Sequence, residues 1–208
     1  MQVTSISWCD YTWNPITGCS YAGPECTNCF AERLSLEHGW SDSQWLPGNA
    51  DENVTVHPNR LDEPNEFDYP DGFGRIFVYS MSDLFHPLVD EAVIEKVVAT
   101  AREYPEHVWI FLTKRPERAA ALGLDWPDNA WVGTSVGSGP SGEFPDTSRR
   151  IDALRDIDAT TEPDASTRRE MDEQWARAIH QAAREQDIPF YVELQNCLRG
   201  KTNRRRRN

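Results

Sequence analysis

The sequence predicts an α/β protein built on a parallel sheet. Continuous apolar runs, each of the length of one strand, alternate with segments that have the apolar period of an amphipathic helix. Runs of this kind are typical of strands buried on both faces, and strand–helix alternation is typical of parallel connections. The sequence therefore favours a parallel sheet, either open or closed into a barrel.

The alternation is clearest from residue 75 onward. Residues 75–80 (R-I-F-V-Y-S) are expected to form a buried strand, and residues 90–104 a helix with valine and isoleucine on one face. Strands at 107–112 and 130–134 flank a helix that Pro116 opens. The later expected elements are helices at 148–157 and 168–187 and a last strand at 188–194.

The first part of the chain is less regular. A short strand within residues 1–14 leads into a loop, and residues 27–38 are expected to form a helix that Gly39 ends. A further short strand is expected at residues 54–56. Four tryptophans are expected to pack around these loops, namely Trp8, Trp13, Trp40 and Trp45.

One interval departs from the alternation. Between Thr134 and Ile188 we expect two helices and no strand, because the linking segment (A-T-T-E-P-D-A-S-T) is short and polar. Either a complete barrel unit is therefore expected to be missing there, or the sheet is expected to be incomplete. The length fits one domain over residues 1–198, followed by a basic tail at 199–208.

Composition limits the classes of protein to consider. The chain has 208 residues, 38% of them hydrophobic, and lacks an apolar run long enough to span a membrane. It also lacks a recognisable signal peptide, so we expect a cytoplasmic protein. A net charge of -13 with only three lysines is typical of halophile proteins, in which salt screens the repulsion between carboxylates.

The segment from Trp13 to Arg33 carries three of the five cysteines. Cys19, Cys26 and Cys29 have the spacing C-x6-C-x2-C on a loop and the first turn of the expected helix. In a reducing compartment, clustered thiols serve metals or redox chemistry. Backbone N–H groups at a helix start also favour thiolates by lowering the thiol pKa. The segment therefore predicts a metal site.

The spacing leaves the metal open. Zinc sites and iron–sulfur clusters usually have four protein ligands, and Cys9 or His38 could complete a zinc tetrahedron. A site with three thiolates instead leaves one position of the metal open, as a catalytic site requires. Cys9 and Cys197 are otherwise expected to be small buried side chains.

Polar side chains follow the expected strands, at the edge where functional residues of parallel α/β folds gather. They are Ser82, Asp83, Thr113, Lys114, Arg115, Thr134, Ser135, Glu193 and Gln195. Asp83 could equally cap a turn, whereas a functional role is favoured for Lys114. His57 and His86 each precede a proline and are expected in turns.

The cysteine segment, W-N-P-I-T-G-C…C-T-N-C-F-A-E-R, resembles the radical S-adenosylmethionine (radical SAM) superfamily, in particular its spore-photoproduct-lyase-like branch. It is closer still to a phage-associated family of unknown function with the motif W-N-P-x-T-G-C…C-x2-C-[FY]-A-E. The segments V-Y-S-M-S-D-L-F-H and I-F-L-T-K-R-P-E-R are similar to further motifs of that family. The first cysteine gap differs from the superfamily's commonest spacing, C-x3-C-x2-C.

The resemblance implies an incomplete parallel (β/α) barrel of radical SAM type, with one or two βα units shortened or missing after residue 135. Cys19, Cys26 and Cys29 would hold a [4Fe–4S] cluster, and SAM would bind its fourth iron. Reductive cleavage of SAM would give a 5′-deoxyadenosyl radical that acts on an unknown substrate, such as a nucleic acid or nucleotide. The residues implied to bind SAM or substrate are Ser82, Asp83, Thr113, Lys114 and Ser135, with Asp83 and Lys114 as the catalytic pair.

The same resemblance implies a reductant protein as a partner, besides the small-molecule cofactor, and no membrane. Two alternatives remain open. One is a zinc-stabilised binding module without catalysis, and the other is an inactive, shortened homologue of the phage-type family. The net charge of -13 disfavours tight binding to a nucleic-acid duplex, because it repels phosphate.

Overall fold

The structure is a computed structural model that describes residues 1–6, 8–135, 147–157 and 159–164. Within these ranges, none of the helices has the length and apolar character needed to cross a membrane. Several predictions lie outside the described residues: the helix at 168–187, the strand at 188–194, Glu193, Gln195, Cys197 and the tail at 199–208.

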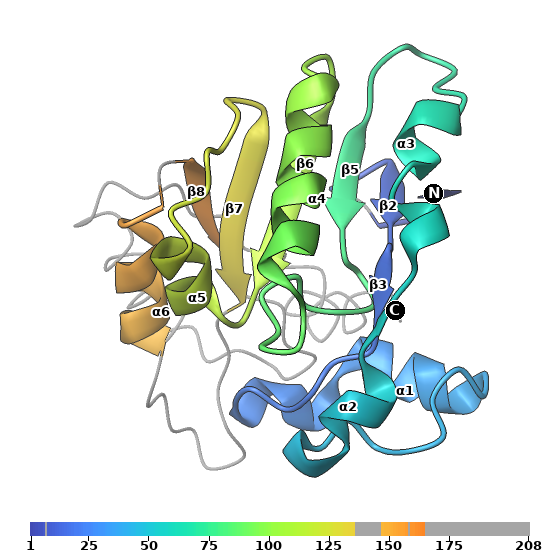
Figure 1. The fold of residues 1–208 in the computed structure, drawn as a ribbon, viewed down its shortest axis with the longest axis vertical. Helices are drawn as coiled ribbons and strands as arrows, with labels where there is room; N and C mark the ends of the chain where they lie inside the picture. Colours follow the sequence, from blue (N-terminus) through green and yellow to red (C-terminus); the bar gives the residue numbers. More distant parts are fainter. Residues whose placement is uncertain (7, 136–146, 158, 165–208) are drawn as a thin grey trace, which may run out of the picture.

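A six-stranded open sheet forms the centre of the fold, in the order β1-β2-β5-β6-β7-β8 (Figure 1). β1 is antiparallel to β2, and the other neighbouring strands are parallel. The strands are β1 (Gln2–Val3), β2 (Tyr11–Trp13), β5 (Arg75–Val78), β6 (Val108–Thr113), β7 (Ala130–Ser135) and β8 (Thr160–Asp164). The prediction of an α/β fold on a mainly parallel sheet is confirmed, and the strands of the described residues do not close into a barrel.

The helices surround the sheet at different places. Figure 1 shows α4 across one face of the sheet and α1 and α2 beyond the end toward which the arrowheads of β5 and β7 point. The α-helices are α1 (Phe30–Glu37), α2 (Ala50–Asn53), α3 (Glu63–Glu66), α4 (Glu91–Glu103), α5 (Pro116–Ala121) and α6 (Thr147–Leu154). Short 3₁₀ helices are η1 (Pro24–Asn28), η2 (Pro47–Asn49) and η3 (Pro58–Arg60), and β3 (Ile16–Thr17) pairs with β4 (Thr55–Val56).

The core lies between the sheet and α4. Alternate residues of the strands turn toward the helix, whose apolar positions recur with the helical period. This packing removes the largest side chains of β2 and β6, together with Ile76 and Val78 of β5, from water and so fixes the register of the strands. The buried residues that form it include Trp13, Ile76, Val78, Ile94, Val97, Val98, Ala101, Trp109 and Phe111.

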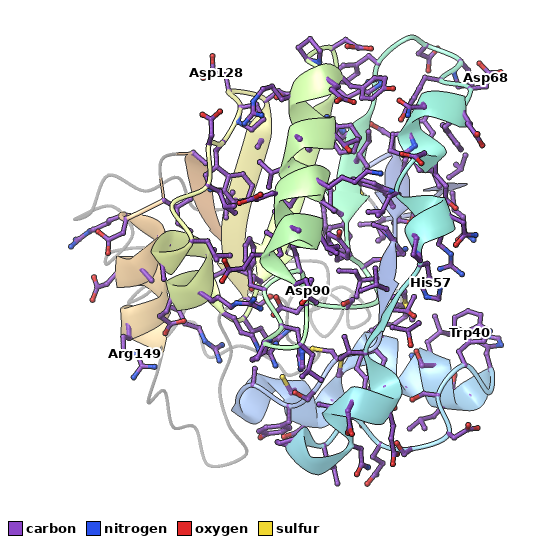
Figure 2. The ribbon with its side chains drawn as sticks, in the orientation of Figure 1. Trp40, His57, Asp68, Asp90, Asp128 and Arg149 are labelled. Carbon is purple, nitrogen blue, oxygen red and sulfur yellow. The ribbon has the colours of Figure 1, made fainter. Side chains whose placement is uncertain are left out.

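Three predictions about these elements are wrong. The helix expected over 27–38 begins at Phe30, because residues 24–28 form η1 instead. The polar segment after α6 does contain a strand: β8 pairs in parallel with β7. Pairing through backbone hydrogen bonds does not require apolar side chains, so the composition hid this strand. Trp13 and Trp45 are buried as expected, but Trp40 is 66% exposed beside α1 (Figure 2).

Candidate functional site

The carboxyl ends of β5, β6 and β7 bring together polar residues that are distant in sequence. The hydroxyl of Thr113, the last residue of β6, donates to Asp83 Oδ1 at 2.7 Å. The hydroxyl of Thr134, opposite Thr113 in β7, donates to the Thr113 carbonyl at 2.9 Å. Three of the predicted site residues therefore meet at one edge of the sheet.

Both oxygens of the buried Asp83 carboxylate are bonded within the protein. Oδ1 also accepts the backbone N–H of Phe85, and Oδ2 accepts the N–H of Lys114 and the guanidinium of Arg115, each at 3.0 Å. Burial raises the pKa of this carboxyl, but the charge of Arg115 and the hydrogen bonds from Thr113 and Lys114 outweigh burial and hold the pKa below its usual value. Asp83 thus caps a turn and also organises the strand ends.

Arg115 joins Asp83 to the cysteine loop. Its Nη1 donates to Asp83 Oδ2 and lies 3.5 Å from Cys19 Sγ, while its Nη2 donates to the Ser20 carbonyl at 2.8 Å. A guanidinium suits this position because its donors lie in one rigid plane and can serve several acceptors at once. Arg115 therefore links the cysteine loop to the buried carboxylate at the end of the sheet.

A second arginine reaches the same loop from α6. Arg150 is 5% exposed, and its Nη2 donates to the Ala22 carbonyl at 3.3 Å. Its Nη1 lies 3.4 Å from the carbonyl oxygen of Ser135, the last residue of β7. Two cationic side chains from different elements thus bind carbonyls of the loop that follows Cys19.

The glycine before Cys19 sets the path of the chain. Gly18 has φ +80°, its N–H donates to the Met81 carbonyl at 2.9 Å, and it forms an isolated parallel bridge with Ser82. A Cβ at this position would lie 1.8 Å from the carbonyl oxygen of Asn53. Both the backbone conformation and the close approach exclude any other residue, which explains the glycine of the T-G-C motif.

The three predicted metal ligands occupy different kinds of backbone. Cys19 follows Gly18 on a loop, Cys26 lies in η1, and Cys29 is the N-cap residue of α1. The backbone N–H of Ala22 lies 3.5 Å from Cys26 Sγ and points toward it. All three thiols are free rather than in disulfides.

The thiol of Cys19 differs from the expectation of a lowered pKa. Burial and the charge of Asp83 raise the pKa of Cys19 to about 11, although Arg115 acts in the opposite direction. The expectation rested on a helix start, and Cys19 does not lie on a helix. A metal at this position would therefore have to displace the thiol proton.

The three cysteines do not form a ready-made site for a single metal ion in the described structure. Among the described residues, no three His, Cys, Asp or Glu side chains converge closely enough to hold one metal ion. Thiolates of one zinc ion each lie about 2.3 Å from it, so the sulfurs would have to move together to bind zinc. A [4Fe–4S] cluster is held by thiolates spread over its irons and is tuned by hydrogen bonds to the sulfurs. In this structure Arg115 Nη1 lies 3.5 Å from Cys19 Sγ, and the Ala22 N–H lies 3.5 Å from Cys26 Sγ.

The two residues considered as a fourth zinc ligand lie elsewhere. Cys9 precedes β2, and its neighbour Asp10 binds Arg75 at the first residue of β5, which is the amino end of the sheet. The His38 ring stacks on Trp40 with centroids 4.8 Å apart. Neither residue supports the zinc alternative.

Three predicted ligand-binding residues remain at the carboxyl edge. The Ser82 hydroxyl is buried and has no hydrogen-bond partner in the described structure, a condition that a bound ligand or water normally relieves. Ser135 is buried at the end of β7, and Lys114 is half-buried at the end of β6. The orphaned hydroxyl is the clearest indication of a ligand at this edge.

Ser20 and His86 were not predicted as part of the site. The N–H of Leu88 points to His86 Nδ1 at 3.2 Å, so the neutral ring carries its proton on Nε2, which lies 2.8 Å from Ser20 Oγ. Burial and the charge of Arg115 lower the pKa of His86 to about 4. This neutral histidine fixes the Ser20 side chain, and it also lies in a turn as expected.

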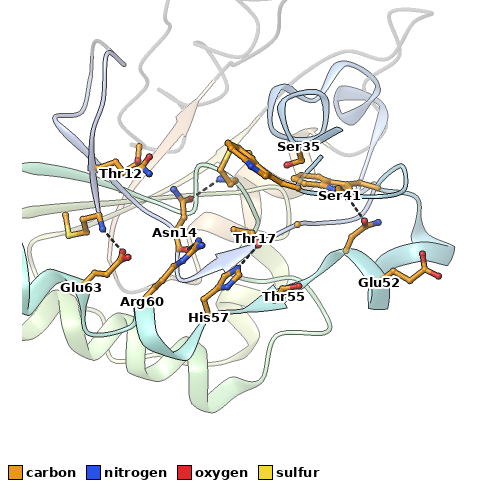
Figure 3. Close-up of a pocket in the computed structure, with 17 residues that line it drawn as sticks. Thr12, Asn14, Thr17, Ser35, Ser41, Glu52, Thr55, His57, Arg60 and Glu63 are labelled. Carbon is orange, nitrogen blue, oxygen red and sulfur yellow. Dashed lines mark hydrogen bonds and ion pairs between the residues drawn. The ribbon is translucent and has the colours of Figure 1, made fainter. Parts of the chain in front are cut away.

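A polar cavity of about 530 Å³ adjoins the cysteine loop (Figure 3). Gly18 and Met81 line the cavity, but none of the predicted metal- and ligand-binding residues does, so the cavity and the predicted site are separate. His57 also lines the cavity, where its Nε2 lies 2.8 Å from Thr17 Oγ1 (Figure 3). His57 lies in the turn before η3, as expected.

Comparisons with known proteins give one match. No curated protein and no solved structure matches the chain. A family model described as "Protein of unknown function (DUF5131)" matches residues 3–163, which include the cysteine segment and the ends of β5, β6 and β7. Since this match covers more than half of the sequence, the chain belongs to the DUF5131 family.

Proposed function

We propose that this protein is an iron–sulfur protein of radical SAM type, in which Cys19, Cys26 and Cys29 hold a [4Fe–4S] cluster. The observation that carries the proposal is the attachment of the cysteine loop to the carboxyl edge of a parallel sheet by Arg115 and Arg150. Ligands of α/β folds bind at this edge. An incomplete barrel of radical SAM type is part of the proposal, and the open sheet is compatible with it.

The surroundings of the sulfurs support the proposal. The Ala22 N–H and the Arg115 guanidinium provide donors to two thiolates, Cys26 and Cys19. With the cluster and SAM bound, the site would supply a 5′-deoxyadenosyl radical by reductive cleavage of SAM. The chain itself would keep the ligands in place and limit contact with water at the end of the sheet.

The predicted site residues divide into two roles. Asp83 and Thr113 bond to each other and to the backbone, so we assign them to positioning. Ser82 has a buried hydroxyl available for SAM or substrate. Lys114 provides a cation at the same edge, suited to a carboxylate such as that of SAM, and remains the catalytic candidate.

The substrate is proposed to be a nucleotide or a nucleic acid. This choice of substrate rests on the resemblance of the cysteine segment, because the cavity of about 530 Å³ is lined by none of the predicted SAM- or substrate-binding residues. The net charge of -13 disfavours a long duplex, because non-specific phosphate binding needs basic surface. A reductant protein would supply the electron.

The first experiment is anaerobic purification with metal analysis. We expect about four irons per chain in the wild type. Cys26→Ala should lose iron without unfolding, whereas Cys9→Ala, at the opposite end of the sheet, should keep it. Stoichiometric zinc without iron would replace the proposal with the zinc-stabilised binding module.

The second experiment separates the active protein from an inactive homologue. The iron-loaded wild type is incubated with SAM and dithionite, and 5′-deoxyadenosine is measured. Formation of 5′-deoxyadenosine that Cys26→Ala abolishes is the expected result. An iron-loaded protein that forms none would be the inactive homologue, an outcome made plausible by the complete internal pairing of Asp83.

A further inference from the structure

We propose that Arg115 is a positioning residue with two tasks: it holds the cysteine loop on the sheet, and it is the counter-charge of the Cys19 sulfur. Asp83 keeps Arg115 in place for both. The second task rests on the proposed function, because it concerns the sulfur as a cluster ligand. The first task does not, because it concerns the chain alone.

The geometry of Arg115 is fixed from both sides. Its Nη1 lies 3.0 Å from Asp83 Oδ2, and Asp83 is itself held by Thr113 Oγ1 and the Lys114 N–H. On the other side, Nη2 donates to the Ser20 carbonyl at 2.8 Å. The guanidinium therefore bridges a rigid strand end and a loop with little regular structure of its own.

The charge of Arg115 lies where it would affect a cluster. Nη1 is 3.5 Å from Cys19 Sγ, and the Arg115 and Asp83 side chains are only 14% and 7% exposed, so water screens them poorly. Reduction adds negative charge, so a nearby cation favours the reduced state and a nearby carboxylate opposes it. Hydrogen bonds to cluster sulfurs are an established means of tuning potential.

This arrangement predicts shifts of opposite sign. Arg115→Gln removes the cation and leaves the Asp83 carboxylate unbalanced near Cys19, so the midpoint potential becomes more negative. Asp83→Asn leaves the cation unbalanced, so the potential becomes more positive. We expect each shift to reach about 59 mV, a tenfold change in a one-electron equilibrium. A merely structural role would not reverse the sign.

Arg115→Lys separates the two tasks. Lysine retains a charge, but its single ammonium cannot bond the Ser20 carbonyl and Asp83 in one rigid plane. This variant should have a potential close to that of the wild type and a loosened loop. It also keeps the proposal testable if Arg115→Gln fails to fold, as judged by circular dichroism.

The test has a metal-free arm and an iron-loaded arm, both on the full chain. In the first, hydrogen exchange is measured for the peptide over residues 18–29. We expect at least tenfold faster exchange in Arg115→Gln and Arg115→Lys. The matched control is Arg102→Gln. Arg102, on α4, binds both the carbonyl and the carboxylate of Asp125, and this link does not involve the cysteine loop. The control variant should therefore leave the exchange rate of the peptide over residues 18–29 unchanged. In the second arm, a redox titration gives the midpoint potentials.

Each outcome decides one task. Wild-type exchange in both Arg115 variants would overturn the loop-holding role. The counter-charge role would be overturned if Arg115→Gln and Asp83→Asn had the midpoint potential of the wild type. It would also be overturned if the two variants shifted the potential in the same direction. A wild type that takes up no iron would overturn the counter-charge role together with the proposed function, and the exchange data would still decide the loop-holding role.

Discussion

Two aspartate–arginine pairs lie at opposite ends of the same sheet. Asp10 and Arg75 join the amino ends of β2 and β5 with an N–O distance of 2.9 Å, and their side chains are 39% and 41% exposed. Asp83 and Arg115 lie at the carboxyl end at 3.0 Å and are 7% and 14% exposed. The two pairs have nearly the same distance but differ in exposure to water, and they differ in geometry because Arg75 binds Asp10 through Nε, Nη2 and its backbone N–H.

Exposure decides what each pair can do. An exposed pair is screened by water, and either partner can be lost with little effect. A buried pair must stay complete, because removing one partner leaves an uncompensated charge. The buried pair is also the one that reaches beyond the sheet to the cysteine loop, which places the site at this end of the fold.

The largest expected effect comes from breaking the buried pair. Asp83→Ala should lower the free energy of unfolding by about 3–5 kcal/mol, because Arg115 remains buried without its carboxylate. Urea denaturation measures this loss. Replacing both residues with apolar side chains should cost less than Asp83→Ala alone. A loss below about 1 kcal/mol for Asp83→Ala would show that the pair behaves like an exposed one.

The next effect is a pH dependence of the unfolding free energy that His86 gives to the carboxyl end of the sheet. Burial and then the charge of Arg115 lower the pKa of His86 from 6.5 to about 4, so folding favours the neutral ring. His86 therefore contributes to the free energy of unfolding in full above pH 6.5, and the contribution is lost as the pH falls toward 4. The contribution is roughly 3 kcal/mol at most.

The variant His86→Gln tests this window. Its unfolding free energy should fall less than that of the wild type between pH 6.5 and 4. Asp83 acts at lower pH: its lowered pKa means a contribution that is present above its usual value of 3.8 and is lost as the pH falls further. Identical slopes for wild type and His86→Gln would refute the role given to His86.

A smaller effect is expected at the exposed end. Asp10→Ala should lower the free energy of unfolding by less than Asp83→Ala does, because water and salt screen its ion pair even though the contact is bidentate and Asp10 also accepts the Arg75 N–H. Thermal unfolding of Asp10→Ala and Asp83→Ala under the same conditions compares the two losses of stability directly. Equal losses for the two variants would remove the distinction between the two ends.

The smallest expected effect is the change in the coupling energy of each ion pair with salt. Double-mutant cycles measure the coupling of Asp10 with Arg75 and of Asp83 with Arg115 in dilute buffer and in about 1 M salt, where the Debye length is about 3 Å. The coupling of the exposed pair should vanish in salt, and that of the buried pair should persist. The acidic composition also predicts that the wild type gains stability in salt, and equal stability would count against the halophile interpretation.

The same contrast explains how much the sequence could predict. Runs such as the one around Trp109 and the helical period of α4 predict the core, because burial acts on each side chain locally. The polar ends of strands also indicated Asp83 and Thr113. The link from Arg150 to Ala22 spans distant parts of the chain, so no local spacing could predict it.

Other features were hidden for a different reason. β8 pairs through its backbone, and its polar side chains give no strand signal. The pairing of His86 with Ser20 depends on the loop folding back onto the turn after β5. The motif shows a glycine before Cys19, but the sequence does not show why a glycine is needed there. The reason is the carbonyl of Asn53, which only the folded chain brings close to Gly18.

The most direct test of the central claim is the electron paramagnetic resonance spectrum of the reduced, iron-loaded protein with and without SAM. The account predicts a cluster signal that changes shape when SAM is added, because three thiolates leave one iron open to it. Cys26→Ala should lack this signal. A cluster signal that SAM leaves unchanged, or iron retained in full by Cys26→Ala, would contradict a three-cysteine site with an open position.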